Sequence, residues 1–358
     1  MISSICRRTK PTRRDGFVGL GSSAGALMLP RAGFAQDGLE ELAAKAKVEG
    51  EVIWYTSLVI PQVVRPLADA FEATYPGVKV NFTRQTSADL AQRIITEHRA
   101  GRMLADVFDG SSTIFPLLEA DAVDSYSPHA ATSFAPEFRD AAGFWTALNV
   151  YYLVPSYNTG LVSKDEAPKS YADLLDPKWQ GRMAWADDPG INGPPGFIAM
   201  ILGQMGQEAG MDYLRRLAAQ KIAKVPAAQR VVLDQVIAGE HAIGLMTFNH
   251  HVAISKEAGA PIEWVRAEPA VNTMNYLGLT KGGAHPNAAR LLLEFALSEK
   301  GQAVLQGANY LPANPKVAAK VPALKPLEGG FKAFSISTES QRKNFADWLR
   351  IYEDLFRK

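Results

Sequence analysis

The sequence predicts an α/β fold of two lobes, with parallel-rich sheets and a ligand cleft between the lobes. Short β-rich runs alternate with amphipathic helical runs over residues 51–121, an order typical of a parallel sheet that is covered on both faces. About 320 residues follow the N-terminal segment, which is the length of two average domains. The extended apolar run 145–157 is placed to cross from one domain to the other.

The first part of the chain reads as alternating helices and strands. Apolar residues recur at helical spacing in the helical runs, and either Thr86 or Ser87 is the expected N-cap of the helix that begins there. The expected strands are 51–56, 78–82 and 105–108, and the expected helices are 40–48, 61–75, 87–98 and one that opens at residue 111.

The pattern changes after about residue 121, where a second lobe is inserted and the chain later returns near residues 276–279. The expected strands here are 182–185, 222–225, 242–247 and 262–265, and the expected helices are 171–179, 197–205, 228–239, 249–259, 286–305 and 343–356. We therefore expect residues 36–125 and 273–325 to form lobe 1, and residues 126–272 and 326–358 to form lobe 2, with the C-terminal helices free to pack across both.

Residues 1–35 have the composition of an export signal. Arg13 and Arg14 precede an apolar stretch over 17–29, and Gly33 and Ala35 supply small residues before a cleavage point near Gln36. The paired arginines are typical of the twin-arginine route, and an ordinary secretory signal with basic residues is the alternative. We expect an exported, soluble periplasmic protein.

Composition narrows the function classes further. The one cysteine, Cys6, lies in the signal, so the mature chain has no thiol for a disulfide, a cysteine metal site or a nucleophile. The 38 basic and 37 acidic residues nearly cancel, and no long basic stripe indicates nucleic-acid binding. We expect a monomer that has no cofactor and no resident metal.

Six segments together resemble the family 1 extracellular solute-binding proteins, and among these the ferric-iron-binding branch of ABC importers is the most similar. They are residues 75–80, 105–108, 155–159, 176–182, 239–244 and 298–302, so the resemblance covers nearly the whole mature chain. It implies a periplasmic receptor of the type II two-lobed class, a small-molecule ligand and an ABC permease of the inner membrane as partner.

The chain departs from the iron-binding branch at that branch's iron ligands. The branch places a tyrosine pair after the strand matched by residues 242–247, where this chain has His250 and His251. It places a histidine where this chain has residues 57–59, and a glutamate where this chain has residues 110–112. Hard anionic ligands suit ferric iron better than neutral imidazole does. Iron, free or chelated, is therefore the alternative ligand, and a small polar solute with an anionic group is the first.

Topology selects the candidate cleft residues. Ser57 follows the first strand, and Ser87, Ser111 and Ser112 stand at expected helix starts, where free N–H groups and hydroxyls suit an anion. Arg84 and Arg230 are candidates for a bidentate clamp. Helix capping and solvated surface positions are the alternative interpretations of these residues.

Further candidates come from the second lobe and from the crossings. Asn249, His250 and His251 open a helix at the family's ligand position, Asp187 lies in a Gly/Pro loop, and Tyr276 lies near a crossing. An adjacent histidine pair is weak evidence for a metal, since helical metal sites use i, i+4 spacing. Packing and capping remain the alternatives for each residue.

Catalytic motifs are missing. The sequence has no Gly-x-Ser-x-Gly elbow, no His-Glu-x-x-His helix and no phosphate-loop lysine motif. We therefore expect a binding protein rather than an enzyme, and a secreted hydrolase with scattered Ser, His and Asp residues is the alternative from another class.

Overall fold

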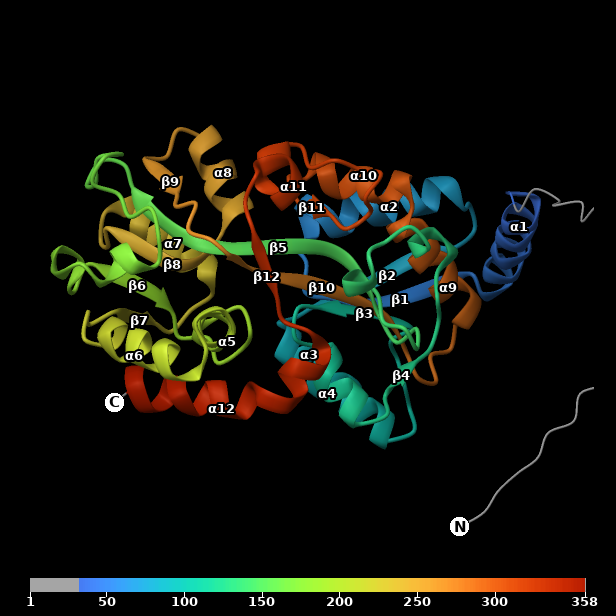
Figure 1. Cartoon of the computed structure of the whole chain (residues 1–358). Helices are drawn as coiled ribbons and strands as arrows, with labels where there is room; N and C mark the ends of the chain where they lie inside the picture. The colour runs from blue at the N-terminus through green and yellow to red at the C-terminus, as the bar shows by residue number, and fades with distance from the viewer. Residues whose placement is uncertain (1–31, 358) are drawn as a thin grey trace, which may run out of the picture.

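The computed structural model describes residues 32–357, so the signal predicted for residues 1–35 lies almost wholly outside the described residues. The described chain has two lobes joined by long central strands, with one lobe at each end of the molecule in Figure 1. No helix within residues 32–357 combines the length and the apolarity that a membrane-spanning helix needs. The fold class predicted from the sequence is confirmed.

Lobe 1 is built around a three-stranded parallel sheet. Strand β1 pairs in parallel with β2 on one side and with β3 on the other, as the alternation of strands and helices predicts. Its elements are α1 (Ala32–Glu49), β1 (Glu51–Thr56), α2 (Arg65–Thr74), β2 (Lys79–Arg84), α3 (Ser87–Arg99), β3 (Val107–Gly110), α4 (Ile114–Glu119), β4 (Val123–Asp124), α9 (Pro286–Leu297), α10 (Glu299–Gly307) and β11 (Leu311–Pro312).

Lobe 2 has a smaller parallel group, in which β6 pairs with β7 and β8. Its elements are β6 (Met183–Ala186), α5 (Pro194–Met205), α6 (Gln207–Ala218), β7 (Ala223–Val225), α7 (Gln229–Ala238), β8 (Ile243–Phe248), α8 (Asn249–Glu257), β9 (Ile262–Trp264) and α12 (Thr338–Phe356). Short helical turns occupy Ile60–Val64, His129–Ala131, Pro136–Phe138, Ala172–Leu175, Pro177–Trp179 and Pro322–Leu324.

Two long antiparallel strands connect the lobes. Strand β5 (Thr146–Asn158) and strand β10 (Ala270–Thr280) pair side by side, and nearly every residue of both is buried. A third connection runs through α11 (Pro326–Gly329) and β12 (Ala333–Ser335), which pairs with β10. The sheet order is β2-β1-β3-β10-β5-β8-β6-β7, so the sheet is continuous and mixed, with its parallel parts at the two ends.

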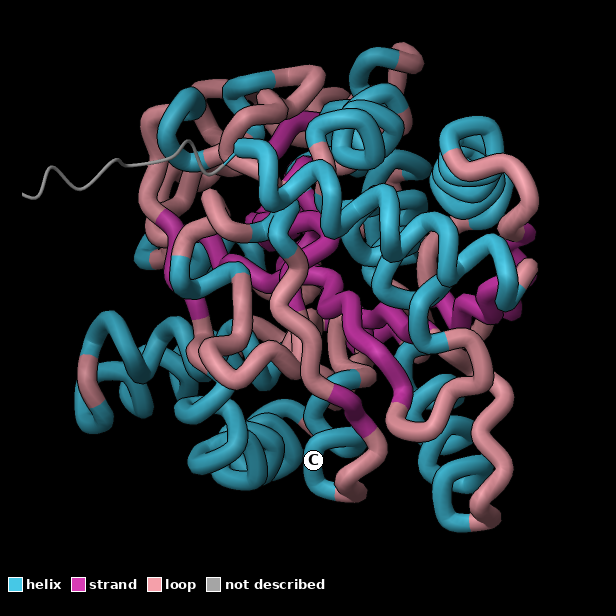
Figure 2. Tube along the Cα trace, turned by 90° about the vertical axis from the view of Figure 1, so that its right-hand side faces the viewer, coloured by secondary structure: helices cyan, strands magenta, loops and turns pink. Residues whose placement is uncertain are grey.

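Helices cover both faces of this sheet, and Figure 2 shows the strands as a middle layer between them. One apolar core surrounds Trp54, Phe71 and Phe108 in lobe 1, and a second surrounds Trp185 and Phe197 in lobe 2. Helix α12 closes the second core from below in Figure 1, since its Tyr352 and Phe356 pack on Trp185.

The expected helices differ from the structure in three places: one is divided, one was missed, and the helix expected to open at residue 111 begins at Ile114. Residues 286–305 do not form one helix, because Ser298 adopts an extended conformation between α9 and α10, and its hydroxyl oxygen accepts a hydrogen bond from the Gly301 N–H. Helix α6 was not predicted, although the buried Leu214 and Leu217 recur at helical spacing within it. The expected cap at Thr86 is confirmed, since its side chain accepts from the Asp89 N–H.

Candidate functional site

Three of the predicted serines gather at the end of β3. The Ser57 N–H and hydroxyl both donate to Asp109 Oδ1 at 3.0 Å. Gly110 has φ +155°, and a Cβ there would meet the Thr113 hydroxyl oxygen at 2.0 Å and the Ser87 hydroxyl oxygen at 2.8 Å. Only glycine fits this turn, and it brings Ser57, Ser87 and Ser111 to one place on lobe 1.

A hydrogen bond across the lobes meets this turn. Asn192, from the loop before α5, donates its amide N–H to the Ser111 hydroxyl oxygen at 3.0 Å. Gln229 holds that loop by donating to Asp188 Oδ2 at 2.8 Å and to the Asn192 carbonyl at 3.0 Å. The lobes are therefore in contact at Ser111, and Asn192 is a site residue that the sequence reasoning missed. The Gly/Pro-rich loop was its only signal.

The central strands present a buried polar face beside this contact. Asn149 of β5 lies opposite Asn275 of β10, and β3 pairs with β10 so that Asp109 lies opposite Leu277. Opposite residues of an antiparallel pair, and residues two apart, share a face, so Asp109, Asn149, Thr273 and Asn275 lie on the same side of the sheet. All four side chains are buried.

Many polar atoms of this face have no hydrogen-bond partner among the described residues. They are Asp109 Oδ2, both amide atoms of Asn149, the Thr273 hydroxyl and Asn275 Oδ1, and both ring nitrogens of the adjoining His250 belong to the same set. A buried polar group without a partner costs about 1–3 kcal/mol, and such groups are rare in native proteins. Their concentration at the junction of the lobes marks this face as the candidate ligand site.

Aromatic rings border the polar face. Tyr151 stacks on His250 with ring centroids 5.6 Å apart, and Tyr310 lies 5.5 Å from His250. Burial raises the pKa of Tyr151 well above its usual range, and the charges of Tyr310 and Asp109 add to the rise. Burial also lowers the pKa of His250 well below its usual range. These groups are therefore neutral hydrogen-bonding surfaces at physiological pH.

His251 and Arg230 lie together on lobe 2, next to this border. The two histidine rings are 4.3 Å apart. Burial, together with the nearby positive charge of Arg230, lowers the pKa of His251 to about 4. The Arg230 guanidinium donates from Nε and Nη2 to Asp234 on its own helix, at 3.0 and 2.7 Å. Arg230 is therefore near the candidate site but is bound elsewhere.

The remaining candidates have other contacts. Arg84 donates from Nε to the Leu58 carbonyl at 3.0 Å, which keeps its exposed side chain beside Ser57. The buried Asn249 amide donates to the Leu324 carbonyl at 2.8 Å. Tyr276 packs edge-on against Trp145 and Phe115, with centroids 4.9 and 5.4 Å away.

Ser112 lines a separate hollow between the lobes. This hollow has a volume of about 640 Å³ and lies between α4, the loop at Ile191 and the start of α12. Its lining includes the apolar side chains of Phe115 and Phe345. The two neighbouring serines thus face different surroundings: Ser111 meets Asn192, and Ser112 borders this hollow.

Asp187 is the candidate that the structure places in a structural network. Its Oδ1 accepts from the Tyr352 hydroxyl at 2.6 Å and from Arg357 Nη2 at 2.7 Å. The carboxylate thus ties the end of β6 to the end of α12.

We expect Asp187→Ala to lower the free energy of unfolding by about 1–2 kcal/mol, because the Tyr352 hydroxyl and Arg357 lose their partner. Urea unfolding measures this change. Asp234→Ala, which removes an exposed pair within one helix, is the matched control and should change stability by less than about 0.5 kcal/mol. Unchanged stability with weakened solute binding would instead indicate that Asp187 contacts the solute.

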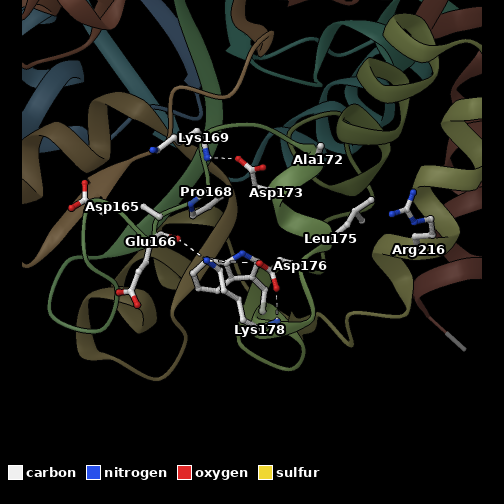
Figure 3. A pocket seen from close by; sticks show the side chains of 12 residues that line it. Asp165, Glu166, Pro168, Lys169, Ala172, Asp173, Leu175, Asp176, Lys178 and Arg216 are labelled. Atoms are coloured by element: carbon white, nitrogen blue, oxygen red, sulfur yellow. Dashed lines mark hydrogen bonds and ion pairs between the residues drawn. The ribbon is translucent and has the colours of Figure 1, made fainter.

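A second groove lies on the surface of lobe 2, away from the junction, and is shown in Figure 3. It has a volume of about 520 Å³. Two of its charged side chains are bound to the backbone: Lys178 Nζ donates to the Glu166 carbonyl at 3.0 Å, and Asp173 accepts from the Lys169 N–H at 2.8 Å. These satisfied groups make it a weaker candidate than the polar face.

No group of three or more His, Cys, Asp or Glu side chains suited to a metal ion occurs in the described part of the chain. The expectation of no resident metal stays a prediction from the sequence. The ligand contacts of the candidate residues also stay predictions.

The amino-acid sequence matches a known protein family. The profile of the family "Bacterial extracellular solute-binding protein" matches residues 104–329, which is more than half of the chain. The "Fe(3+)-binding periplasmic protein" of Serratia marcescens is 24% identical over 263 residues, which cover 70% of this chain and 76% of that protein.

Solved structures share the fold. A Trichodesmium protein (IdiA, FutA) in complex with iron and citrate superposes with a TM-score of 0.72 at 21% identity, over 86% of this chain and 100% of that chain. AfuA of Actinobacillus pleuropneumoniae with bound fructose-6-phosphate superposes with a TM-score of 0.70 at 22% identity, over 86% and 99%. The chain belongs to the family of bacterial extracellular solute-binding proteins.

Proposed function

We propose that this protein is the periplasmic receptor of an ABC importer, which captures a small polar solute with an anionic group between its lobes and delivers it to the inner-membrane permease. It binds the solute without converting it. The observation that supports this proposal best is the buried polar face at the junction of the lobes, with its many unpartnered hydrogen-bonding atoms.

A solute explains why such a face persists. The unpartnered atoms lower the stability of the empty closed form, and a solute that hydrogen-bonds them restores that stability. Because the solute then binds the closed form better than the open form, it shifts the population toward closure by hinge motion about the central strands. The bond between Ser111 and Asn192 joins the two lobes, so it must break for them to separate.

The anionic group of the solute is assigned to the turn at Gly110, beside Ser87 and Ser111, which is called the serine turn below. The hydroxyls of Ser87 and Ser111 lie there, and Arg84 adds a positive charge beside Ser57, whose own hydroxyl donates to Asp109. The N-terminus of the 13-residue helix α3, at Ser87, adds free N–H groups and the positive end of a helix dipole. Phosphate, phosphonate and carboxylate groups fit this combination of donors.

A charge introduced at Ser111 tests the proposal. Aspartate at this position still accepts from Asn192, but it repels an anionic solute, so Ser111→Asp should raise the Kd of an anionic solute at least about tenfold. A thermal-shift screen of phosphate esters, phosphonates and carboxylates, followed by titration calorimetry, measures this. Ser133→Asp, at an exposed position, is the matched control. Equal affinities in the two variants would count against the anion pocket.

Ferric iron, free or chelated, is the second candidate solute. The comparisons favour it, since the Serratia marcescens relative is named for ferric iron and the Trichodesmium structure holds iron with citrate. Metal analysis of the purified protein, with and without added ferric citrate, distinguishes the candidates. Stoichiometric iron that chelators remove, together with no response to organic anions, would favour the iron receptor.

The proposal extends to export and assembly. The sequence of residues 1–35 supports export, by the twin-arginine route or by the general secretory route, and the near balance of charges supports a receptor without nucleic-acid partners. We expect the mature receptor to be a monomer that meets its permease in the closed form.

A further inference from the structure

Asp109 is a buried carboxylate that is only half satisfied. It is 0% exposed, at the end of β3. Its Oδ1 accepts three hydrogen bonds, from the Ser57 N–H, the Ser57 hydroxyl and Asn275 Nδ2, each at 3.0 Å. Its Oδ2 accepts none of these three, and a hydrogen bond from the buried Thr56 side chain also acts on this carboxyl group and opposes the rise of its pKa. These donors hold the carboxylate in one orientation, so Oδ2 is an acceptor in a fixed position whose lone pairs can still serve a solute.

Asn275 supplies a second acceptor beside the first. Because its Nδ2 donates to Asp109, the orientation of the amide is determined, and its other atom, Oδ1, is an acceptor. That oxygen is buried and also unpartnered among the described side chains. Two acceptor oxygens, Asp109 Oδ2 and Asn275 Oδ1, therefore occupy this end of the polar face.

The negative charge of Asp109 itself excludes an anion at this end of the polar face. None of the ion pairs in residues 32–357 involves Asp109, so its negative charge faces the junction uncompensated. Like charges brought together in a buried interface cost several kcal/mol. The anionic group assigned to the serine turn must therefore point away from Oδ2, toward Ser87, Ser111 and Arg84.

We infer that the solute has a second, hydrogen-bond-donating end, a hydroxyl or ammonium group, that is bound by Asp109 Oδ2 and Asn275 Oδ1. Asp109 is then a specificity-determining residue that separates hydroxylated or zwitterionic anions from plain ones. The inference rests on the proposed function, because it assigns the other end of the same solute.

Matched pairs of probes test the inference. Glycerol phosphate is compared with propyl phosphate, and phosphoethanolamine with ethyl phosphate, by thermal shift and calorimetry. Members of a pair share the phosphate and differ in hydroxyls or in an ammonium group. The wild-type protein should bind the donor-bearing member of at least one pair with a Kd about tenfold lower or more. This is the effect of one hydrogen bond to a charged group. The pair that responds tells hydroxyl from ammonium.

Asp109→Asn should remove this preference, because it places an amide N–H where Oδ2 accepts. Asn275→Ala removes the second acceptor and leaves both Ser57 donors on Asp109, so it serves if the first variant does not fold. Binding without a preference, or a preference that survives in the folded variants, overturns the inference and leaves the proposed function standing. Failure of every probe to bind contradicts the anionic-solute proposal and the inference with it.

Discussion

Asp106→Asn should lower the free energy of unfolding by about 3 kcal/mol, whereas Asp109→Asn should raise it. Both carboxylates are buried and lie three residues apart. Asp106 accepts from the Ile53 N–H at 2.8 Å, from the His285 N–H at 2.9 Å, and pairs with His285 Nδ1 at 2.8 Å. An amide nitrogen in this carboxylate's place would face donors, so hydrogen bonds between β1 and the start of α9 would be lost.

Asp109 differs because Oδ1 alone accepts the hydrogen bonds from Ser57 and Asn275. Asparagine keeps that oxygen, removes the buried charge and adds an amide group in place of the unpartnered oxygen. Burial raises the pKa of Asp109, so the folded state releases this proton at a higher pH than the unfolded state does. Stability is therefore lost as pH rises above the usual carboxyl range, and Asp109→Asn should stabilise at pH 7 but not near pH 3.

Urea unfolding of the empty protein at these two pH values measures both variants. The pair of changes is its own control, since each makes the same chemical replacement in the same region. Equal destabilisation by both would show that Asp109 is a structural residue like Asp106. A more stable but less discriminating Asp109→Asn protein would show that the binding face lowers stability in return for specificity.

Acidification from pH 7 to pH 4 should destabilise the protein through the histidine pair, by about 3 kcal/mol for His251 alone. Burial lowers the pKa of His251 from 6.5 to about 4, and the charge of Arg230 contributes. Below pH 6.5 the unfolded imidazole takes up a proton that the folded one refuses. Stability is therefore complete above pH 6.5 and is lost as pH falls toward 4, and His250 contributes in the same direction.

Comparison of His251→Gln with the wild-type protein isolates the contribution of His251 to the pH dependence of stability. The variant has no imidazole to protonate, so its free energy of unfolding should fall by about 3 kcal/mol less between pH 7 and pH 4. His129→Gln, at an exposed position, is the matched control. Parallel pH profiles for His251→Gln and the wild-type protein would contradict the lowered pKa. They would mean that water reaches the ring in the folded state.

Local patterns predicted the elements whose signals are local. Strand β1 and the crossing strand β5 follow runs of β-branched, aromatic and apolar residues, and Thr86 caps α3 because a hydroxyl there meets free N–H groups. The break at Ser298 was missed because apolar spacing continues across it into α10. Gly301 decides the geometry there, since a Cβ on it would lie 2.2 Å from the Phe295 carbonyl oxygen.

The site was predicted in part, for a similar reason. Residues at strand ends and helix starts, such as Ser57, Ser87 and Ser111, are visible in sequence because topology brings such positions together. Asp187 looked equivalent, but its partners Tyr352 and Arg357 come from α12, 165 and 170 residues away. Asn192 meets Ser111 from 81 residues away, and its Gly/Pro-rich loop does not indicate that partner.

The order of residues was thus enough to predict the alternation of strands and helices, the crossing strand and the family, because each depends on composition or on neighbours in the chain. The roles of Asp106 and Asp109 depended on the folded arrangement. Both are carboxylates beside one strand, and only the donors brought to them from β1, β10 and the start of α9 make one a structural bond and the other an acceptor that can serve a solute. Hydrogen bonds act over about 3 Å in space, so partners distant in sequence determine which polar groups remain free for a solute.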